Sequence, residues 1–181
     1  DLDFLEDGES VGDFADGEKI DGEVMRFATG DVGRDHYWLG IRAWRGDGSS
    51  VGIYYSRVNT EEMVKQICID RGVKPNHTYI DSGYEAGRIY DLCKRFGWVA
   101  IKGDSARSYK HRKAGGGVDE RLMSPRKSII APAGGRVPLV HLAVDPIKDI
   151  LARLRSGEGA RWQVPLDIGD DWINQLDSEE R

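Results

Sequence analysis

The stretch His77-Thr78-Tyr79-Ile80-Asp81-Ser82-Gly83 decides the fold of this 181-residue chain. Residues 77–81 have the composition of a short buried strand, which Ser82-Gly83 ends directly after an aspartate. A helix is predicted from about Tyr84 to Phe96, with Gly97 at its C-terminal end. Residues 98–102 form the next predicted strand. A strand, a helix and a second strand in this order favour parallel pairing with the helix covering one face.

Three strands are predicted before this unit, over residues 25–28, 37–44 and 51–58. Short connections between them, such as Gly46-Asp47-Gly48, favour an antiparallel meander. A helix then begins at Asn59, where Asn59 and Glu62 have the spacing of a capping box, and Gly72 ends it.

A β-hairpin is predicted after the second parallel strand, from residues 128–131 and 137–142. Asp145-Pro146 marks the start of a helix that extends to about Leu154, with Asp as cap and Pro in the first turn. Residues 162–165 resemble a short strand, and 170–180 a last helix. The predicted fold class is therefore α/β, with a mixed five-stranded sheet, flanking helices and an extra β-hairpin.

Charge divides the chain into two regions. Residues 1–24 contain ten acidic residues and one lysine, whereas the net charge of the whole chain is −5, so residues 25–181 carry a net charge of +4. We interpret 1–24 as an acidic linker or leader and 25–181 as one folded domain. No apolar run is long enough to span a bilayer, and two cysteines are too few for a disulfide scaffold.

Basic residues gather between Ser105 and Lys127, where seven bases face two acids around three consecutive glycines. Such a loop is either a solvated surface or a contact to phosphates. The candidates for contact with a phosphate backbone are Lys102, Arg88, Arg107, Lys110, Arg112 and Lys113. The four histidines lack the spacing of a zinc site, and Trp38, Trp44 and Trp98 fit the core of a sheet.

Two aspartates follow strand residues where the backbone is freed by glycine: Gly30-Asp31 and Asp81-Ser82-Gly83. If the first and fourth strands are adjacent and parallel, both side chains emerge at the same edge of the sheet. Carboxylate oxygens are the ligands that Mg²⁺ and Mn²⁺ prefer, and two such ions stabilise both oxygens of a phosphodiester displacement. Each aspartate alone also fits a turn or cap residue.

The pattern resembles the nuclease domain of bacteriophage terminase large subunits, in the group typified by lambda-like phages, a ribonuclease-H-like family. The likeness is strong over residues 27–103 and patchy elsewhere. It is carried by Phe27–Asp31, Tyr37–Trp44, Tyr79–Tyr84, Ile89–Cys93 and Val99–Gly103, with weaker echoes at Val144–Asp149 and Asp171–Leu176.

The resemblance implies that Asp31 and Asp81 are catalytic, metal-binding carboxylates that hold two Mg²⁺ or Mn²⁺ ions. It also implies a third acidic residue on a helix near the C-terminus of the domain, which we expect beyond Arg181, at a truncated end. The acids of the last third of the chain are poor substitutes for it, namely Asp145, Asp149, Asp170 and Asp171.

The resemblance further implies that the chain cleaves double-stranded DNA during viral genome packaging in the cytoplasm of an infected bacterium. Its expected partners are an ATPase domain of the same longer chain, the portal and the small terminase subunit, and no membrane. No phosphate-binding loop with Lys-Ser/Thr occurs in this sequence. Two alternatives remain open: another ribonuclease-H-like nuclease of the resolvase or integrase type, or a catalytically idle module that binds DNA or a portal.

Overall fold

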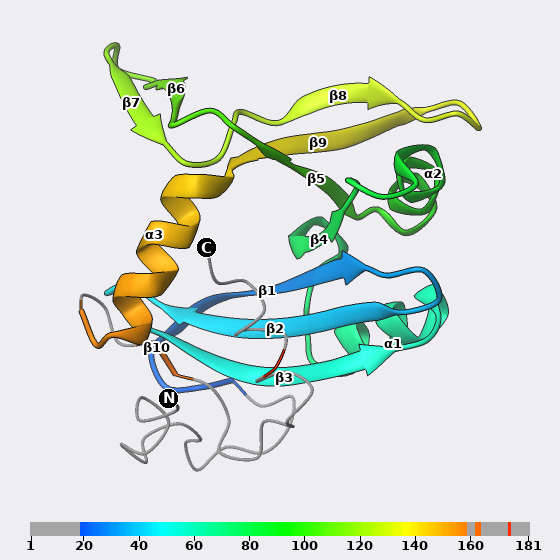
Figure 1. The fold of residues 1–181 in the computed structure, drawn as a ribbon, viewed down its shortest axis with the longest axis horizontal. Coiled ribbons are helices and arrows are strands. Elements are labelled where there is room, and N and C mark those ends of the chain that lie inside the picture. The colour runs from blue at the N-terminus through cyan, green and yellow to red at the C-terminus, as the bar shows by residue number, and fades with distance from the viewer. Residues whose placement is uncertain (1–18, 159–161, 164–173, 175–181) are drawn as a thin grey trace.

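The computed structural model describes residues 19–158, 162–163 and 174, and its main feature is one eight-stranded sheet (Figure 1). The strand order across this sheet is β10-β3-β2-β1-β4-β5-β9-β8. A separate pair of strands, β6 and β7, forms a small second sheet. The strands are β1 (Glu23–Val32), β2 (Tyr37–Arg45), β3 (Ser50–Val58), β4 (Thr78–Asp81), β5 (Val99–Asp104), β6 (Tyr109–Arg112), β7 (Val118–Arg121), β8 (Lys127–Ile130), β9 (Arg136–Ala143) and β10 (Trp162–Gln163).

The centre of the sheet has the predicted mixed pairing. Strands β1, β2 and β3 form the antiparallel meander, and β4 and β5 add to β1 in parallel. The predicted hairpin is β8 and β9, and β9 pairs in parallel with β5. The hairpin therefore widens the main sheet instead of standing apart from it. The α/β fold class is confirmed, and the order β3-β2-β1-β4-β5 is compatible with a ribonuclease-H-like fold.

The helices lie close to their predicted positions, but two caps differ. They are α1 (Glu61–Asp70), the short 3₁₀ helix η2 (Pro75–His77), α2 (Ala86–Phe96) and α3 (Val144–Arg155). Thr60, not Asn59, caps α1, because its Oγ1 accepts the Met63 amide at 3.2 Å. Strand β9 continues directly into α3, so Asp145 lies in the first turn and Ala143 takes the cap position. An acid in that turn still favours the helix dipole. Gly97 ends α2 with φ 73°, as predicted.

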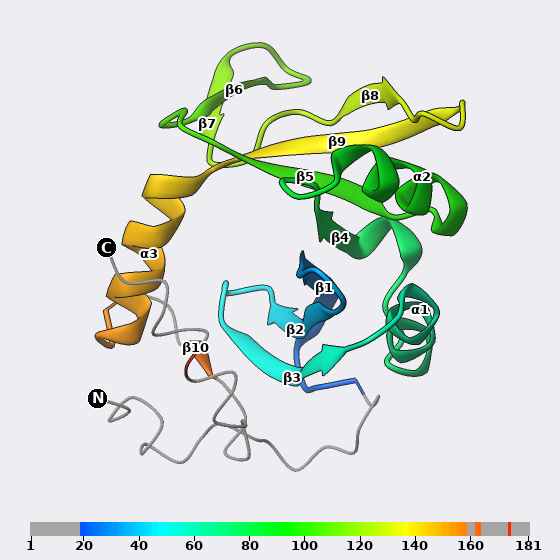
Figure 2. The same ribbon diagram turned by 45° about the vertical axis from the view of Figure 1, so that its right-hand side comes forward.

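One face of the sheet is covered by α1 and α2. Val64 and Cys68 of α1 and Ile89 and Cys93 of α2 are buried against strand residues such as Ile80. Figure 2 shows these helices on one side of the sheet and α3 on the other. Within the described part of the chain, no helix is long and apolar enough to cross a membrane.

The two ends of the sequence are described only in part. Ile20 already packs against Ala43 and Val51, next to the start of β1. Residues 1–18 lie outside the described residues, so the acidic leader stays a prediction. At the other end, β10 pairs in parallel with the start of β3. The predicted helix over 170–180 lies outside the described residues, apart from position 174.

Candidate functional site

Asp31 and Asp81 lie at equivalent positions on neighbouring parallel strands. In the pairing of β1 with β4, Ala28 is opposite Thr78, and Gly30 is opposite Ile80. Each aspartate follows the last of these pairs by one residue. Because neighbouring strands are about 4.8 Å apart, this register places the two side chains next to each other at the end of both strands. The backbone pairing, which ends at Gly30 and Ile80, agrees with the predicted juxtaposition, and the meeting of the two carboxylates stays a prediction.

Both carboxylates also take part in local backbone bonds. Oδ1 of Asp31 accepts the Val32 amide at 3.0 Å, and Oδ1 of Asp81 accepts the Gly83 amide at 3.2 Å. The second bond is the Asx turn that ends β4. Asp31 is exposed and Asp81 is half-buried, so solvent and a cation reach this edge of the sheet.

The two aspartates belong to the face of the sheet opposite α1 and α2, which we call the open face. Side chains alternate between faces along a strand, so Phe27 and Thr29 share this face with Asp31, and Tyr79 shares it with Asp81. The rings of Phe27 and Tyr79 confirm this, because their centroids lie 5.7 Å apart in an edge-on contact.

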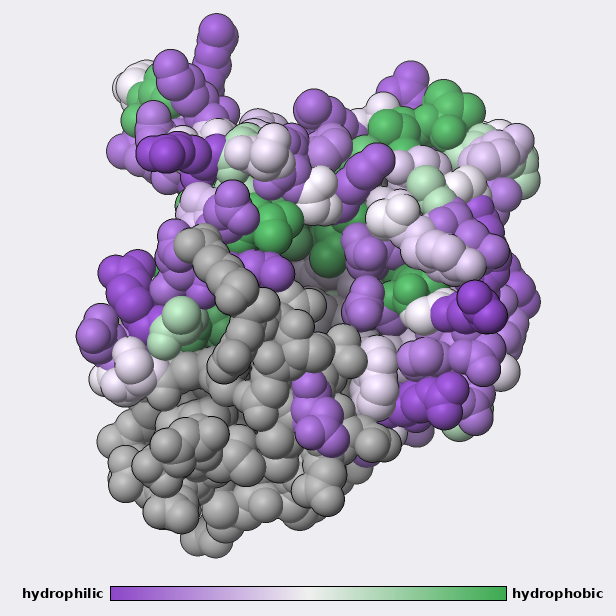
Figure 3. All heavy atoms as spheres, viewed as in Figure 1, coloured by the Kyte–Doolittle hydropathy of each residue, from purple (hydrophilic) through white to green (hydrophobic). Residues whose placement is uncertain are grey.

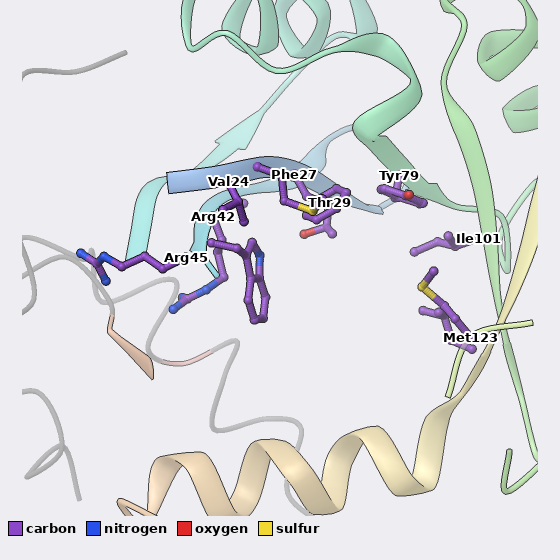
Figure 4. A pocket seen from close by; sticks show the side chains of 12 residues that line it. Val24, Phe27, Thr29, Arg42, Arg45, Tyr79, Ile101 and Met123 are labelled. Carbon is purple, nitrogen blue, oxygen red and sulfur yellow. The ribbon is translucent and has the colours of Figure 1, made fainter. Parts of the chain in front are cut away.

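An apolar groove of about 510 Å³ runs along the open face, and neither aspartate lines it. Figure 3 shows apolar residues in the recess at the centre of this view and polar residues around its rim. Figure 4 shows the lining side chains, with α3 along the opposite side. Thr29 and Tyr79, each two residues before an aspartate, form the end of the groove nearest to the site. The other lining residues are Val24, Met25, Phe27, Gly40, Arg42, Trp44, Arg45, Ile101, Met123 and Leu142.

The wall of the groove on β2 and β3 contains a buried cation. Nη1 of Arg42 donates to the Tyr55 hydroxyl, and its Nη2 donates to Oγ of Ser50 at 3.0 Å. Burial lowers the pKa of Arg42 and raises the pKa of Tyr55, and the bond between the two groups opposes both shifts. The Arg42–Tyr55 pair therefore gives this wall of the groove polar atoms that hydrogen bonds hold in place.

The tryptophans were predicted to lie in the core, and this is correct for only one of them. Trp98 is 1% exposed and packs beside Phe96, with ring centroids 4.6 Å apart. Trp38 and Trp44 lie half-buried on the open face instead. Trp38 pairs directly with Asp31 across β1 and β2. Alternation within β2 explains the difference, because the residues between them, such as Leu39 and Ile41, take the core face.

Two of the predicted DNA contacts lie away from the aspartates. Lys102 follows Ile101, which pairs with Asp81, so alternation directs Lys102 to the face opposite Asp81. Arg88 of α2 donates to the Tyr37 hydroxyl at 2.9 Å and lies 3.6 Å from Glu61 of α1. Arg88 thereby joins two helices to β2. Its contact with DNA stays a prediction.

The other predicted contacts, Arg107, Lys110, Arg112 and Lys113, lie on or beside the β6–β7 hairpin, which projects from the main sheet (Figure 1). The side chains of Lys110 and Arg112 are exposed on one face of β6. Nζ of Lys113 is 2.7 Å from Oδ1 of Asp119, which neutralises it in part. The hairpin therefore presents two exposed cations close together and a third that is already paired.

The candidate metal ligands in this part of the chain are the two predicted carboxylates, Asp31 and Asp81. No three His, Cys, Asp or Glu side chains among the described residues come together as a metal site. Asp145 and Asp149 are exposed on α3, and Asp170 and Asp171 lie outside the described residues. Two carboxylates on adjacent strands fit a hard divalent cation, which takes its remaining ligands from water or phosphate. The third acid implied by the resemblance stays a prediction.

Comparisons with protein-family models, with curated proteins and with solved structures find no match to this chain.

Proposed function

We propose that this chain is a divalent-metal-dependent endonuclease that cleaves double-stranded DNA, of the kind found in the large subunit of phage terminases. The observation that supports the proposal is the register of β1 with β4, in which Asp31 and Asp81 each follow the last pair, Gly30 and Ile80, by one residue. Asp31 and Asp81 would hold Mg²⁺ or Mn²⁺. Two such ions supply charge stabilisation to the attacking and leaving oxygens of the phosphodiester.

The chain's own part in this reaction is to bind and orient the DNA. The exposed cations of the β6–β7 hairpin contact phosphates. The open face lies beside the DNA strand that enters the site. In the setting of genome packaging, the partners are an ATPase domain of a longer chain, the portal and the small terminase subunit, in the cytoplasm of an infected bacterium.

The direct test is nicking of supercoiled plasmid with Mn²⁺ or Mg²⁺. We expect cleavage by the wild type and at least a hundredfold loss in Asp31→Asn and in Asp81→Asn, since each substitution removes a charged metal ligand. Asp70→Asn is the matched control, because Asp70 is an exposed aspartate at the end of α1. Cleavage by both site variants at the wild-type rate would disprove the nuclease. Linear duplex, branched DNA and RNA–DNA hybrid as substrates separate a terminase-like nuclease from a resolvase-like one.

The second candidate is a DNA- or portal-binding module without catalysis. It is favoured by one observation, that no three potential metal ligands come together in the described part of the chain. Calorimetric titration with Mn²⁺ separates the candidates. An idle module binds no ion at this edge, whereas the nuclease binds Mn²⁺ and loses that binding in Asp31→Asn.

A further inference from the structure

We propose that Arg126 forms a phosphate-binding site on the open face, where it holds the DNA backbone outside the carboxylate pair. The inference rests on the proposed nuclease function and names one more contact of its substrate. Arg126 lies in the connection between β7 and β8, 47 residues after Tyr79. Its side chain nevertheless reaches the strand that carries Asp81.

Two hydrogen bonds orient the guanidinium group. Nη2 of Arg126 donates to the Tyr79 hydroxyl at 3.0 Å and to the Asn76 carbonyl at 3.1 Å. The guanidinium carbon also lies 6.0 Å from the centroid of the Tyr79 ring. Because the group is already held in place, binding a ligand costs less side-chain entropy than it does for a free surface arginine.

The aromatic support beneath Arg126 is itself packed. The Tyr79 ring meets Phe27 edge-on at 5.7 Å, and Phe27 lies 5.2 Å from the ring of His77. These three rings come from β4, β1 and η2, so elements on both sides fix the position of the Tyr79 hydroxyl.

The guanidinium group keeps donors for a ligand. Both bonds to protein use Nη2, and in the part of the chain that the structure describes neither Nε nor Nη1 of Arg126 has a protein acceptor. The same described residues provide no carboxylate in an ion pair with it, and the side chain is exposed. Both bidentate edges of a guanidinium group include an Nη2 N–H, so the free Nε and Nη1 donors suit single hydrogen bonds to a phosphate, helped by the uncompensated charge.

The position of Arg126 determines which phosphate of the DNA backbone it binds. Tyr79 precedes Asp81 by two residues on the same face, a step of about 7 Å along the strand. The contact with Asn76 places the guanidinium group toward the beginning of β4, away from the carboxylates. A DNA strand that follows β4 therefore meets Arg126 at a phosphate separate from the one that is cleaved.

The test is binding of a fluorescein-labelled DNA duplex, measured by anisotropy over a series of KCl concentrations in EDTA, so that no divalent ion contributes. We expect Arg126→Gln to raise Kd about tenfold and to lower the slope of log Kd against log salt by about one. Arg126→Lys keeps the charge and hence the slope, with a smaller rise in Kd because lysine lacks the planar guanidinium group that Tyr79 and Asn76 orient. Lys127→Gln is the matched control, since Lys127 is the adjacent exposed cation and lies on the edge strand β8. It should change neither value by much.

Equal effects of Arg126→Gln and Lys127→Gln would overturn the proposal, because the change would then reflect net charge alone. If Arg126→Gln unfolds, Tyr79→Phe takes its place, since it removes only the orienting hydroxyl. That variant should raise Kd two- to threefold at an unchanged salt slope, and an unchanged Kd contradicts the site. The assay does not measure cleavage, so a plasmid-nicking failure of the aspartate variants and a failure of Arg126 are separate results.

Discussion

Gly30 and Ile80 face each other directly beneath the two aspartates, and a Cβ atom on Gly30 would lie only 2.8 Å from Cδ1 of Ile80. Ile80 is fully buried against the helices, so its side chain has little room to move. The absence of a side chain at position 30 thus allows β1 and β4 to approach where each carries an acid. The carboxylate pair depends on a residue that points to the other face of the sheet.

Gly30→Ala should therefore weaken both the fold and the site. We expect a loss of about 1–3 kcal/mol in the free energy of unfolding, as is usual when a methyl group is forced into a packed core. Urea unfolding followed by circular dichroism measures this loss. Gly115→Ala is the control, because a Cβ at Gly115 would meet nothing within 4 Å. Equal stability of the two variants would mean that the contact with Ile80 is unimportant.

Metal should stabilise the protein through the two aspartates. A ligand that binds only the folded state raises stability by about 2.7 kcal/mol at one hundred times its Kd. We expect Mn²⁺ to raise the thermal midpoint of the wild type and of Asp70→Asn, but not that of Asp31→Asn or Asp81→Asn. Without metal, Asp31→Asn should be slightly more stable than the wild type, because neighbouring carboxylates repel each other. A shift with Mn²⁺ that survives in both site variants would place the ion elsewhere.

The order of strands and helices was predictable because each element has a simple period and a clear end. Gly72 and Gly97 mark the ends of α1 and α2. The pairing of β1 with β4 followed from the ribonuclease-H-like order of elements. Given that pairing, the adjacency of Asp31 and Asp81 was predictable too.

Features that depend on tertiary context were not predictable. Both faces of β2 carry apolar residues, so its sequence does not say whether Leu39 or Trp38 faces the helices. The N-cap of α1 is Thr60 and not the predicted Asn59, and the sequence could not decide between them because both residue types suit the position. No sequence pattern indicated the position of Arg126, since its contact with Tyr79 spans 47 residues and depends on the course of the β7–β8 connection.

The bond between Arg42 and Tyr55 should be important for stability. Tyr55→Phe leaves a buried guanidinium without one of its acceptors, and we expect a loss of about 2 kcal/mol in the free energy of unfolding. Tyr54→Phe is the control, because the ring of Tyr54 stacks on Arg71 at 4.1 Å and phenylalanine keeps that stack. Chemical unfolding of both variants makes the comparison. A Tyr55→Phe protein as stable as Tyr54→Phe would show that the bond to Tyr55 is not needed to stabilise Arg42.

Acid should destabilise the start of β1 through Glu23. Burial alone would raise the pKa of Glu23, but hydrogen bonds from Arg26 and from the Ile20 amide bring it below its ordinary value of 4.5. The Glu23 and Arg26 side chains are only 7% and 6% exposed. A carboxyl group whose pKa is lower in the folded state stabilises the fold above its unfolded pKa. This contribution is therefore complete above about pH 4.5 and is lost as the pH falls through the folded pKa.

Thermal midpoints from pH 7 to pH 3 test this linkage. The wild type should lose stability below about pH 4.5, and Glu23→Gln should lose less over the same range because its side chain does not titrate. Glu23→Gln should also be less stable than the wild type at pH 7, since it removes the carboxylate charge 2.7 Å from the buried Arg26. Parallel curves for the two proteins would assign the acid sensitivity to other carboxylates.

Lys110 and Arg112 should contribute more to DNA binding than Lys113, although all three are exposed cations of one hairpin. Nζ of Lys113 is already 2.7 Å from Oδ1 of Asp119. Lys110 and Arg112 lie on the other face of the hairpin, where their cross-strand neighbours are Glu120 and Val118. Replacing Lys110 and Arg112 together by alanine should lower the salt slope of duplex binding by up to about two, because each phosphate contact accounts for about one. Lys113→Ala should leave the slope nearly unchanged. If Lys113→Ala lowers the slope by about one, half of the drop expected for the double variant, the ion pair with Asp119 opens when DNA binds, and the hairpin binds DNA through its charge alone.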